Sequence, residues 1–271
     1  MCLILTALDA HPDYALIVAA NRDEFYDRPT AAAAFWSDAP WVLGGRDLEA
    51  GGTWLGIDRN GRFAAVTNYR QGQREPAAHR SRGRLVSDYL TTGISARNHV
   101  DRVEREAELY NGFNLIAGSY RELFYYSNRA SSAGALPEGR ASALAPGVYG
   151  LSNHLLDTAW PKVTSSKSGL TALLASSAPE LVPNLFALLS DRGQAADASL
   201  PRTGVSPEWE RLLSAAFIAS RDYGTRSSTV VLVGRDGRVV FVERTFGPNG
   251  VAGEEVSKEF VLYTNSVNGK R

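Results

Sequence analysis

The feature that most constrains this chain is a set of short apolar runs that come in pairs joined by turn-forming residues. The runs at 2–8 and 14–20 flank Asp9-Ala10-His11-Pro12-Asp13, a pattern typical of a β-hairpin. Three more pairs predict hairpins, at residues 52–58 and 62–68, 113–117 and 123–127, and 228–233 and 239–244. Because the runs lack strict apolar–polar alternation, we expect sheets that are covered on both faces.

Apolar residues at helical spacing lie between these hairpins. They predict helices at 85–90 and 100–109, then at 160–174 and 179–189, and a last strand is expected at 259–263. Strands, two helices, strands, two helices and strands again fit two stacked sheets between two helical layers. We therefore predict an α+β fold, a four-layer αββα sandwich, with residues 1–271 forming a single domain.

Three stretches between these elements are predicted to be loops. Residues 130–147 are rich in Ala, Ser, Gly and Pro, and residues 194–207 are similar in character. Together with residues 70–80, the second of these is expected to shape the pocket of the protein.

Composition excludes several classes of protein. Lys+Arg and Asp+Glu each number 29, so no net field favours nucleic acid or an anionic membrane surface. A single cysteine forms no internal disulfide, which indicates a reducing compartment. The N-terminus lacks the pattern of a signal peptide, and no apolar stretch approaches the roughly 18 residues of a membrane span. We expect a soluble cytoplasmic protein of unknown oligomeric state.

The cysteine is at position 2, where its chemistry depends on the N-terminus. Removal of Met1, which is normal before a small side chain, would leave a thiol and a free α-amine on one residue. The α-amine titrates near pH ~7.7–8.0 and can act as a built-in general base for the thiol. The alternative is that Cys2 only starts a buried strand, since free cysteines are among the most buried residues.

The first hairpin brings polar residues to this cysteine. With the turn at residues 10–13, paired residue numbers add up to 23 or 24, which puts Cys2 opposite Asn21 or Arg22. An arginine beside the thiol would lower the thiol pKa, and Asp23 could accept hydrogen bonds from the α-amine. The alternative is an ordinary charged strand end, with Arg22 and Asp23 paired in solvent.

The run Asn21-Arg22-Asp23-Glu24, following Met1-Cys2, resembles the NRDE-motif family, also called the transport-and-Golgi-organisation protein 2 family. Further segments typical of that family occur in order along nearly the whole chain. They are Arg28-Pro29, Gly44-Gly45-Arg46-Asp47, Gly51-Gly52-Thr53-Trp54-Leu55-Gly56, Thr67-Asn68-Tyr69-Arg70, Tyr110-Asn111-Gly112-Phe113-Asn114-Leu115, Leu151-Ser152-Asn153, Trp160-Pro161-Lys162 and Tyr223-Gly224-Thr225-Arg226-Ser227-Ser228-Thr229.

The resemblance implies a fold like that of N-terminal-nucleophile (Ntn) hydrolases, which is an αββα sandwich. It implies no single reaction, because members have been linked to Golgi organisation, haem movement and lipid or acyl-CoA metabolism. The amidase branch of the Ntn hydrolases includes penicillin V and bile-salt hydrolases. That branch has an N-terminal Cys, and an Arg and an Asp near the end of the second strand, which Cys2, Arg22 and Asp23 match in type and order.

The amidase branch also has a mid-chain Asn and a late Arg. By analogy of role, Asn153 would donate to the oxyanion, with Asn68 as its rival, and Arg226 would be the late arginine. Three further residues are expected to contact substrate: Asn21, Trp54 and Tyr69.

Two functions remain open. The first is an N-terminal-cysteine hydrolase or acyltransferase that acts on a small amide or acyl substrate, and it requires Met1 removal and a depressed Cys2 pKa. The second is a non-catalytic binding or trafficking protein for a hydrophobic carboxylate ligand such as haem or acyl-CoA, with Arg22 and Arg226 as carboxylate clamps. The four histidines show no metal-ligand spacing, so no obligatory metal or cofactor is predicted.

Overall fold

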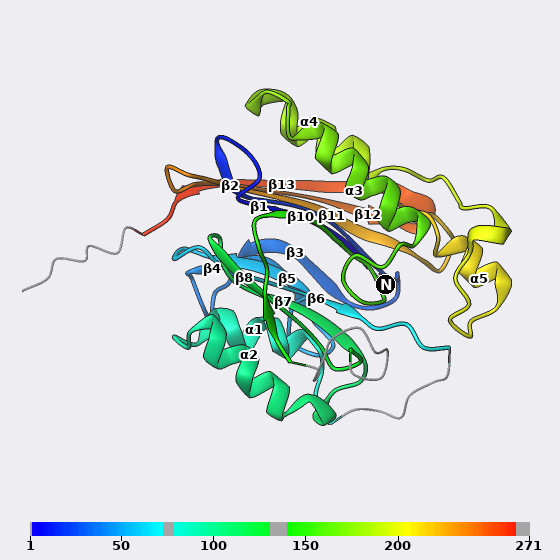
Figure 1. Ribbon diagram of the computed structural model, residues 1–271, viewed down its shortest axis with the longest axis horizontal. Coiled ribbons are helices and arrows are strands. Elements are labelled where there is room, and N and C mark those ends of the chain that lie inside the picture. The colour runs from blue at the N-terminus through cyan, green and yellow to red at the C-terminus, as the bar shows by residue number, and fades with distance from the viewer. Residues whose placement is uncertain (1, 73–78, 131–139, 264–271) are drawn as a thin grey trace, which may run out of the picture.

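Two antiparallel sheets stacked face to face form the centre of the computed structural model, which describes residues 2–72, 79–130 and 140–263 (Figure 1). The first sheet has the strand order β10-β1-β2-β11-β12-β13. Its strands are β1 (Cys2–Leu8), β2 (Tyr14–Phe25), β10 (Gly147–Leu151), β11 (Tyr223–Gly234), β12 (Arg238–Gly247) and β13 (Val251–Val261). The second sheet runs β3 (Thr30–Phe35), β4 (Val42–Asp47), β5 (Leu55–Asp58), β6 (Arg62–Asn68), β7 (Phe113–Ser119), β8 (Glu122–Ser127) and β9 (Ser142–Ala143).

Helices cover the outer faces of both sheets (Figure 1). Helices α3 (Pro161–Leu173) and α4 (Ala178–Leu189) lie over the first sheet, and α1 (Gly83–Thr91) and α2 (Ala96–Arg105) lie over the second. A short helix, α5 (Pro207–Leu212), lies beside the end of the stack where the chain begins. The structure thus confirms the predicted α+β class and four-layer αββα order.

Alternation along β1 explains why both faces of its sheet are buried. Ile4 and Leu8 belong to the core between the two sheets, whereas Leu3 and Leu5 pack under α3 and α4. A third cluster, which includes Tyr89 and Phe113, fills the space between α1, α2 and the second sheet. Strand β1 therefore has two apolar faces, as the run without strict alternation predicted.

The predicted hairpins form, but several boundaries differ. The strand expected at 52–58 begins at Leu55, because the chain turns at Gly51 with φ +75° before it. Strand β2 continues to Phe25 rather than ending at residue 20, and β11 begins at Tyr223 rather than residue 228. The last strand starts at Val251, earlier than expected.

The helix expected at 100–109 spans Ala96–Arg105, and five strands and helices were missed altogether: β3, β4, β9, β10 and α5. The alanine run of β3 and the glycine pair of β4 have low β propensity, so packing between the sheets decides their conformation. Of the predicted loops, residues 73–78 and 131–139 lie outside the described residues. The single-domain expectation for residues 1–271 stays a prediction.

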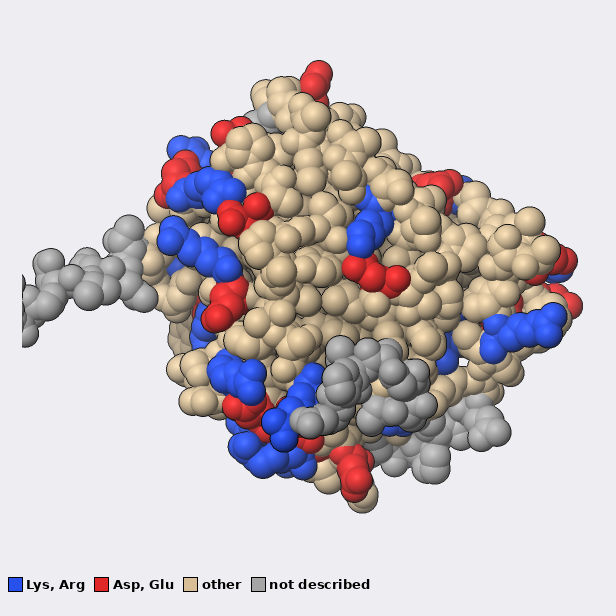
Figure 2. All heavy atoms as spheres, viewed as in Figure 1, with Lys and Arg blue, Asp and Glu red and all other residues tan. Residues whose placement is uncertain are grey.

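Charged side chains of both signs are interspersed on the face of the molecule seen in Figure 2. Within the described residues, no helix is both long and apolar enough to cross a membrane.

Candidate active site

The cysteine lies at the open end of the stack, where β1 begins between β10 and β2. Cys2 pairs with Arg22, one of the two registers expected from the turn length. Its backbone nitrogen donates to Asn153 Oδ1 at 3.2 Å, and its carbonyl oxygen accepts from Ser152 Oγ at 2.8 Å. The segment that follows β10 therefore holds both backbone polar groups of Cys2.

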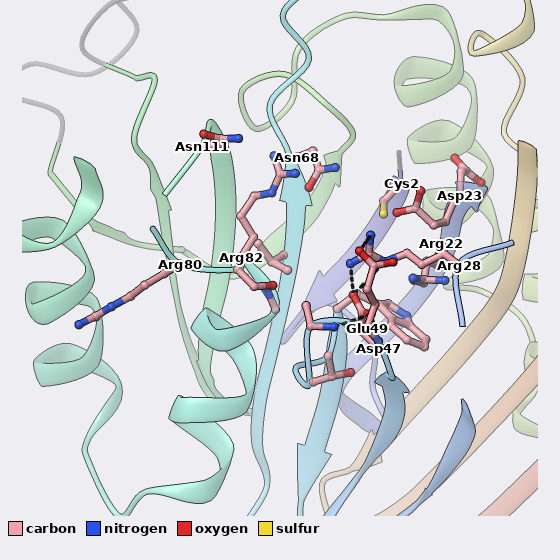
Figure 3. Close-up of a pocket in the computed structure, with 17 residues that line it drawn as sticks. Cys2, Arg22, Asp23, Arg28, Asp47, Glu49, Asn68, Arg80, Arg82 and Asn111 are labelled. Atoms are coloured by element: carbon pink, nitrogen blue, oxygen red, sulfur yellow. Dashed lines mark hydrogen bonds and ion pairs between the residues drawn. The ribbon is translucent and has the colours of Figure 1, made fainter. Parts of the chain in front are cut away.

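A cavity of about 440 Å³ opens next to this cysteine (Figure 3). Cys2, Arg22 and Asp23 line it from the first sheet, and Trp54, just before β5, and Asn68 of β6 line it from the other side. The structure thus brings five of the sequence-predicted site residues to one cavity, from segments far apart in the chain.

Most of the cavity wall is polar. Four arginines and four acidic residues line the cavity: Arg22, Arg28, Arg80, Arg82, Asp23, Glu24, Asp47 and Glu49. Arg28 binds Asp47 at 2.8 Å and Glu49 at 3.4 Å, while Arg80 forms an ion pair with Glu106 and extends away from Cys2 (Figure 3). The charges are therefore largely balanced, and the wall favours polar over purely apolar ligands.

Burial dominates the protonation of Cys2. Burial raises the pKa of the thiol above its ordinary value, and the nearby Asp23 carboxylate adds to this effect. Arg22 lowers the pKa, as predicted, but its contribution is smaller than that of burial. This direction applies to the chain that still carries Met1, so the depressed pKa expected after Met1 removal stays a prediction.

Asp23 and Lys162 are two buried groups of opposite charge, and each influences the pKa of the other. Asp23 Oδ1 accepts from Thr225 Oγ1 at 2.8 Å, and burial raises the pKa of Asp23, with the charge of Lys162 as the main opposing influence. Lys162 is 5% exposed at the start of α3, and burial lowers its pKa to about 8. Both groups therefore titrate away from their ordinary ranges, as groups at functional sites often do.

Arg22 is held in the wall between the sheets. Its guanidinium lies over the Trp54 ring, 4.4 Å from the centroid, and Nη1 donates to Thr30 Oγ1 at 3.3 Å. A guanidinium has five N–H donors, so Arg22 can also bind an acceptor in the cavity.

The two candidate asparagines occupy different places. Asn68 lines the cavity, whereas Asn153 is fully buried beside the Cys2 nitrogen. Asn153 Nδ2 donates to the Asn68 carbonyl oxygen at 3.0 Å. One amide N–H of Asn153 is therefore used to fasten it to β6, while its oxygen holds Cys2.

Three predicted site residues lie elsewhere. Asn21 points to the opposite face of β2 from Arg22, where its amide donates to the carbonyls of Leu189 and Ala216. It is a structural link between the sheet and its covering helix, because successive residues of a strand face opposite sides. The expectation that Asn21 contacts substrate is therefore not supported by its position.

Tyr69 and Arg226 also lie off this cavity as the described residues define it. The Tyr69 hydroxyl is hydrogen-bonded to His154 Nε2 at 2.7 Å. Arg226 is the extra residue of a β-bulge between Thr225 and Ser227, and it donates to the carbonyls of Phe25 and Arg28. The bulge turns Arg226 toward a separate cavity of about 320 Å³.

Sequence reasoning missed Lys162, Arg28 and the acidic pair around Arg28. Lys162 is one of only four lysines in the chain, and it begins a helix whose following residues pack on the sheet. A lysine at the start of a helix that packs on a sheet is a signal that the sequence does contain. That this lysine lies near Asp23 depends on tertiary packing, which the sequence does not reveal. In the described part of the chain, no group of three or more His, Cys, Asp or Glu side chains could hold a metal ion.

The fold is that of an αββα protein, with two stacked sheets between helical layers. Its candidate site has a cysteine at the start of a central strand, beside a polar cavity. The chain belongs to the Transport and Golgi organisation 2 family, whose model matches residues 1–248. It is 40% identical to the Transport and Golgi organization protein 2 homolog of Bos taurus, over 97% of this chain and 99% of that protein. It is 39% identical to the Homo sapiens homolog, over 90% and 93%, respectively.

Solved structures with related arrangements are more distant. A Caenorhabditis elegans ortholog of N-acylethanolamine-hydrolyzing acid amidase is 11% identical with a TM-score of 0.48, over 85% of this chain and 92% of that one. A C2A mutant of the conjugated bile acid hydrolase from Clostridium perfringens is 12% identical with a TM-score of 0.44, over 100% and 95%. These scores are too low to carry an argument, so the fold assignment rests on the observed layers.

Proposed function

We propose that this protein is an N-terminal-cysteine hydrolase or acyltransferase that acts on a small polar amide or acyl compound. The observation that carries the proposal is the position of Cys2, whose nitrogen is held by Asn153 while its residue lines a cavity with Arg22 and Asp23. A thiol, an adjacent nitrogen and buried charges at one cavity are the groups that nucleophilic acyl transfer requires.

The proposed reaction begins after Met1 is removed. Cys2 Sγ attacks the substrate carbonyl carbon while the thiol proton passes to the α-amine of Cys2. The proton then passes to the leaving amine as the C–N bond breaks, which leaves a thioester on Cys2. Water attacks this thioester, gives a proton to the α-amine, and releases the carboxylic acid as the C–S bond breaks and the thiol regains its proton. Attack by another nucleophile in place of water gives acyl transfer.

The neighbouring residues have distinct proposed roles. Asn68, which lines the cavity, is the better placed of the two asparagines to donate to the oxyanion, and Asn153 orients the Cys2 nitrogen. Removing an oxyanion donor typically costs about 100- to 1000-fold in rate. Asp23 stabilises the protonated α-amine, and Arg22 recognises an acceptor on the substrate.

The raised thiol pKa describes the chain that still carries Met1, and the depressed pKa that the mechanism requires is expected once the free α-amine has formed. A thiol that is protonated at neutral pH needs a base at the moment of attack, and the α-amine released by Met1 removal supplies one. We therefore expect processing at residue 1 to switch on the reactivity of Cys2.

The charged wall also bears on the alternative function. A binding protein for haem or acyl-CoA needs a mainly apolar pocket, whereas the cavity at Cys2 is lined by four arginines and four acidic residues. We therefore favour turnover of a small polar substrate over binding of a hydrophobic carboxylate.

The first test is the intact mass of untagged protein before and after brief iodoacetamide treatment from pH 5 to 9. Loss of Met1 with alkylation of Cys2 near neutral pH supports the proposal. A matched form that retains an extra N-terminal residue is expected to alkylate more slowly, because it has no free α-amine on Cys2. Retained Met1 in the untagged protein would contradict the mechanism.

Substrate class is tested with succinyl-p-nitroanilide and octanoyl-p-nitroanilide. We expect faster release of p-nitroaniline from the succinyl compound, and no release by Cys2→Ala. Binding of the octanoyl compound without turnover, unchanged in Cys2→Ala, would favour the binding-protein alternative.

A further inference from the structure

We propose that a chain of hydrogen bonds through the second sheet, formed by Thr67, Asn114 and Tyr125, positions the Ser152–Asn153 segment and thereby sets the reactivity of Cys2. The three residues come from neighbouring strands, β6, β7 and β8. Each would be a positioning residue that does not touch substrate. The inference rests on the proposed function, because it assigns a purpose to the way Cys2 is held.

The chain of hydrogen bonds begins and ends on the same short segment, residues 152–156. At one end, the Leu156 N–H donates to the Tyr125 hydroxyl at 3.1 Å, which donates to Asn114 Oδ1 at 3.0 Å. Asn114 Nδ2 donates to Thr67 Oγ1 at 3.0 Å, which donates to the Ser152 carbonyl at 2.7 Å. Two ends of one loop are thus fastened by a single path across three strands.

All the donors in this path point the same way, from Leu156 toward Ser152. Hydrogen bonds aligned in series polarise and strengthen one another in a low-dielectric interior. Thr67, Asn114 and Tyr125 are all buried. Burial also raises the pKa of Tyr125 to about 12, so its hydroxyl remains a donor at physiological pH.

Burying this path of polar groups costs desolvation free energy, so its presence needs an explanation. Tyr125 belongs to the otherwise apolar core between the sheets. Buried hydroxyl and amide groups must be fully hydrogen-bonded to avoid a desolvation cost, and their net contribution to stability is small. Apolar residues would fill the space as well, so the path is better explained by the segment that it holds in place.

That segment is the one that touches the cysteine. Ser152 Oγ donates to the Cys2 carbonyl and Asn153 Oδ1 accepts from the Cys2 nitrogen, while the Asn153 carbonyl accepts from the Arg70 N–H at 2.7 Å. The nucleophile of the first sheet is therefore positioned by hydrogen bonds that originate in the second. A shift of the segment would move the nitrogen that serves as the base.

The decisive variant is Tyr125→Phe, which keeps the ring and removes only the hydroxyl. Tyr126→Phe is the matched control, because Tyr126 is the next residue of β8, is also buried, and packs in the cluster under α1 and α2. The readouts are the pH midpoint of Cys2 alkylation by iodoacetamide and the rate of Cys2 acetylation by p-nitrophenyl acetate.

We expect Tyr125→Phe to raise the alkylation midpoint by about one pH unit, because a loosened Asn153 stabilises the α-ammonium less and the ammonium favours the thiolate. Acetylation should slow by about 10-fold, since small misplacements of a reacting group are costly. The titratable and charged groups that act on Cys2 are untouched in these variants: Arg22, Asp23, Lys162 and Tyr223.

A second pair of variants protects the test against simple unfolding. Thr67→Ser keeps the hydroxyl and should retain the wild-type profile, whereas Thr67→Val should behave like Tyr125→Phe. If Tyr125→Phe lowers Tm but leaves the midpoint and acetylation rate unchanged, the path is only structural and the inference is wrong. If no variant and no wild-type protein is acetylated, the proposed function fails, while the alkylation midpoints still decide the inference.

Discussion

Two buried aspartates at the ends of strands show how the same residue serves different purposes in this molecule. Asp58 ends β5, with a side chain that is 0% exposed, and it bonds Arg62 Nε at 2.6 Å and the backbone N–H groups of Asn60 and Arg62. Asp23 is equally buried near the end of β2, but it lies at a cavity beside Cys2 and opposite the charge of Lys162.

The two carboxylates differ in where their interaction partners lie in the chain. The acceptors of Asp58 are used within its own turn, by residues two and four positions along the chain, so its burial supports the β5–β6 hairpin. Asp23 instead interacts with groups from distant segments, such as Thr225 and Lys162. A buried carboxylate whose partners all come from its own turn is typical of a structural role. A carboxylate at a cavity whose partners come from several distant segments is typical of a functional site.

The largest expected effect separates the two aspartates by activity. Asp23→Asn should lower turnover of succinyl-p-nitroanilide by about 100- to 1000-fold, because the α-amine loses the carboxylate that orients and stabilises it. Its stability at pH 7 should change little, because relief from burying a charged carboxylate is offset by the loss of the charge that opposes Lys162. Steady-state kinetics and urea unfolding measure the two quantities.

Asp58→Asn is the matched variant, with the same change at an equally buried position. Its turnover per folded molecule should equal that of the wild type. Comparable loss of turnover in both variants would mean that Asp23, too, acts only through the fold.

The comparison also explains what the sequence could reveal. The length of one turn limited the partner of Cys2 to Asn21 or Arg22, and the layers followed from the order of apolar runs. Asn21 could have been assigned correctly as well, because it alternates with Arg22 along β2 and must face the covering helices.

Other parts of the site were beyond sequence reasoning. The contact between Cys2 and Asn153 joins residues 151 positions apart, so nothing local distinguishes Asn153 from Asn68. A single-residue bulge redirects Arg226, and bulges depend on the pairing of neighbouring strands. The burial that raises the thiol pKa and outweighs the effect of Arg22 is likewise a property of the packed structure.

The second expected effect tests whether the Asp58 carboxylate has a structural role. Arg62→Met should destabilise the protein by about 2–4 kcal/mol, because it leaves the Asp58 carboxylate buried without its ion-pair partner. We expect a loss of stability near the lower end of this range, because the Arg62 side chain is 18% exposed and solvent weakens the ion pair. Urea unfolding at pH 7 measures it, with Arg97→Met as control, since Arg97 pairs with Asp101 on an exposed helix surface.

The smallest expected effect concerns Lys162 and its dependence on pH. Burial lowers the pKa of Lys162 from 10.5 to about 8, so between these values the unfolded chain binds the proton more tightly and stability rises with pH. Below about pH 8 the buried ammonium destabilises the fold by up to about 3 kcal/mol. Lys162→Met should therefore be more stable than the wild type at pH 7, by about 1–3 kcal/mol, since Asp23 loses its opposing charge.

This advantage should shrink by about 2 kcal/mol when urea unfolding is repeated at pH 9.5, where the wild-type lysine is mostly neutral. Lys167→Met, one and a half turns along α3, is the control, because Lys167 is 34% exposed and pairs with Asp157 at 2.8 Å. Its effect should be small and the same at both pH values. If Lys162→Met differed from the wild type equally at pH 7 and 9.5, Lys162 would be an ordinary structural lysine, and the contrast with Asp58 would rest on Asp23 alone.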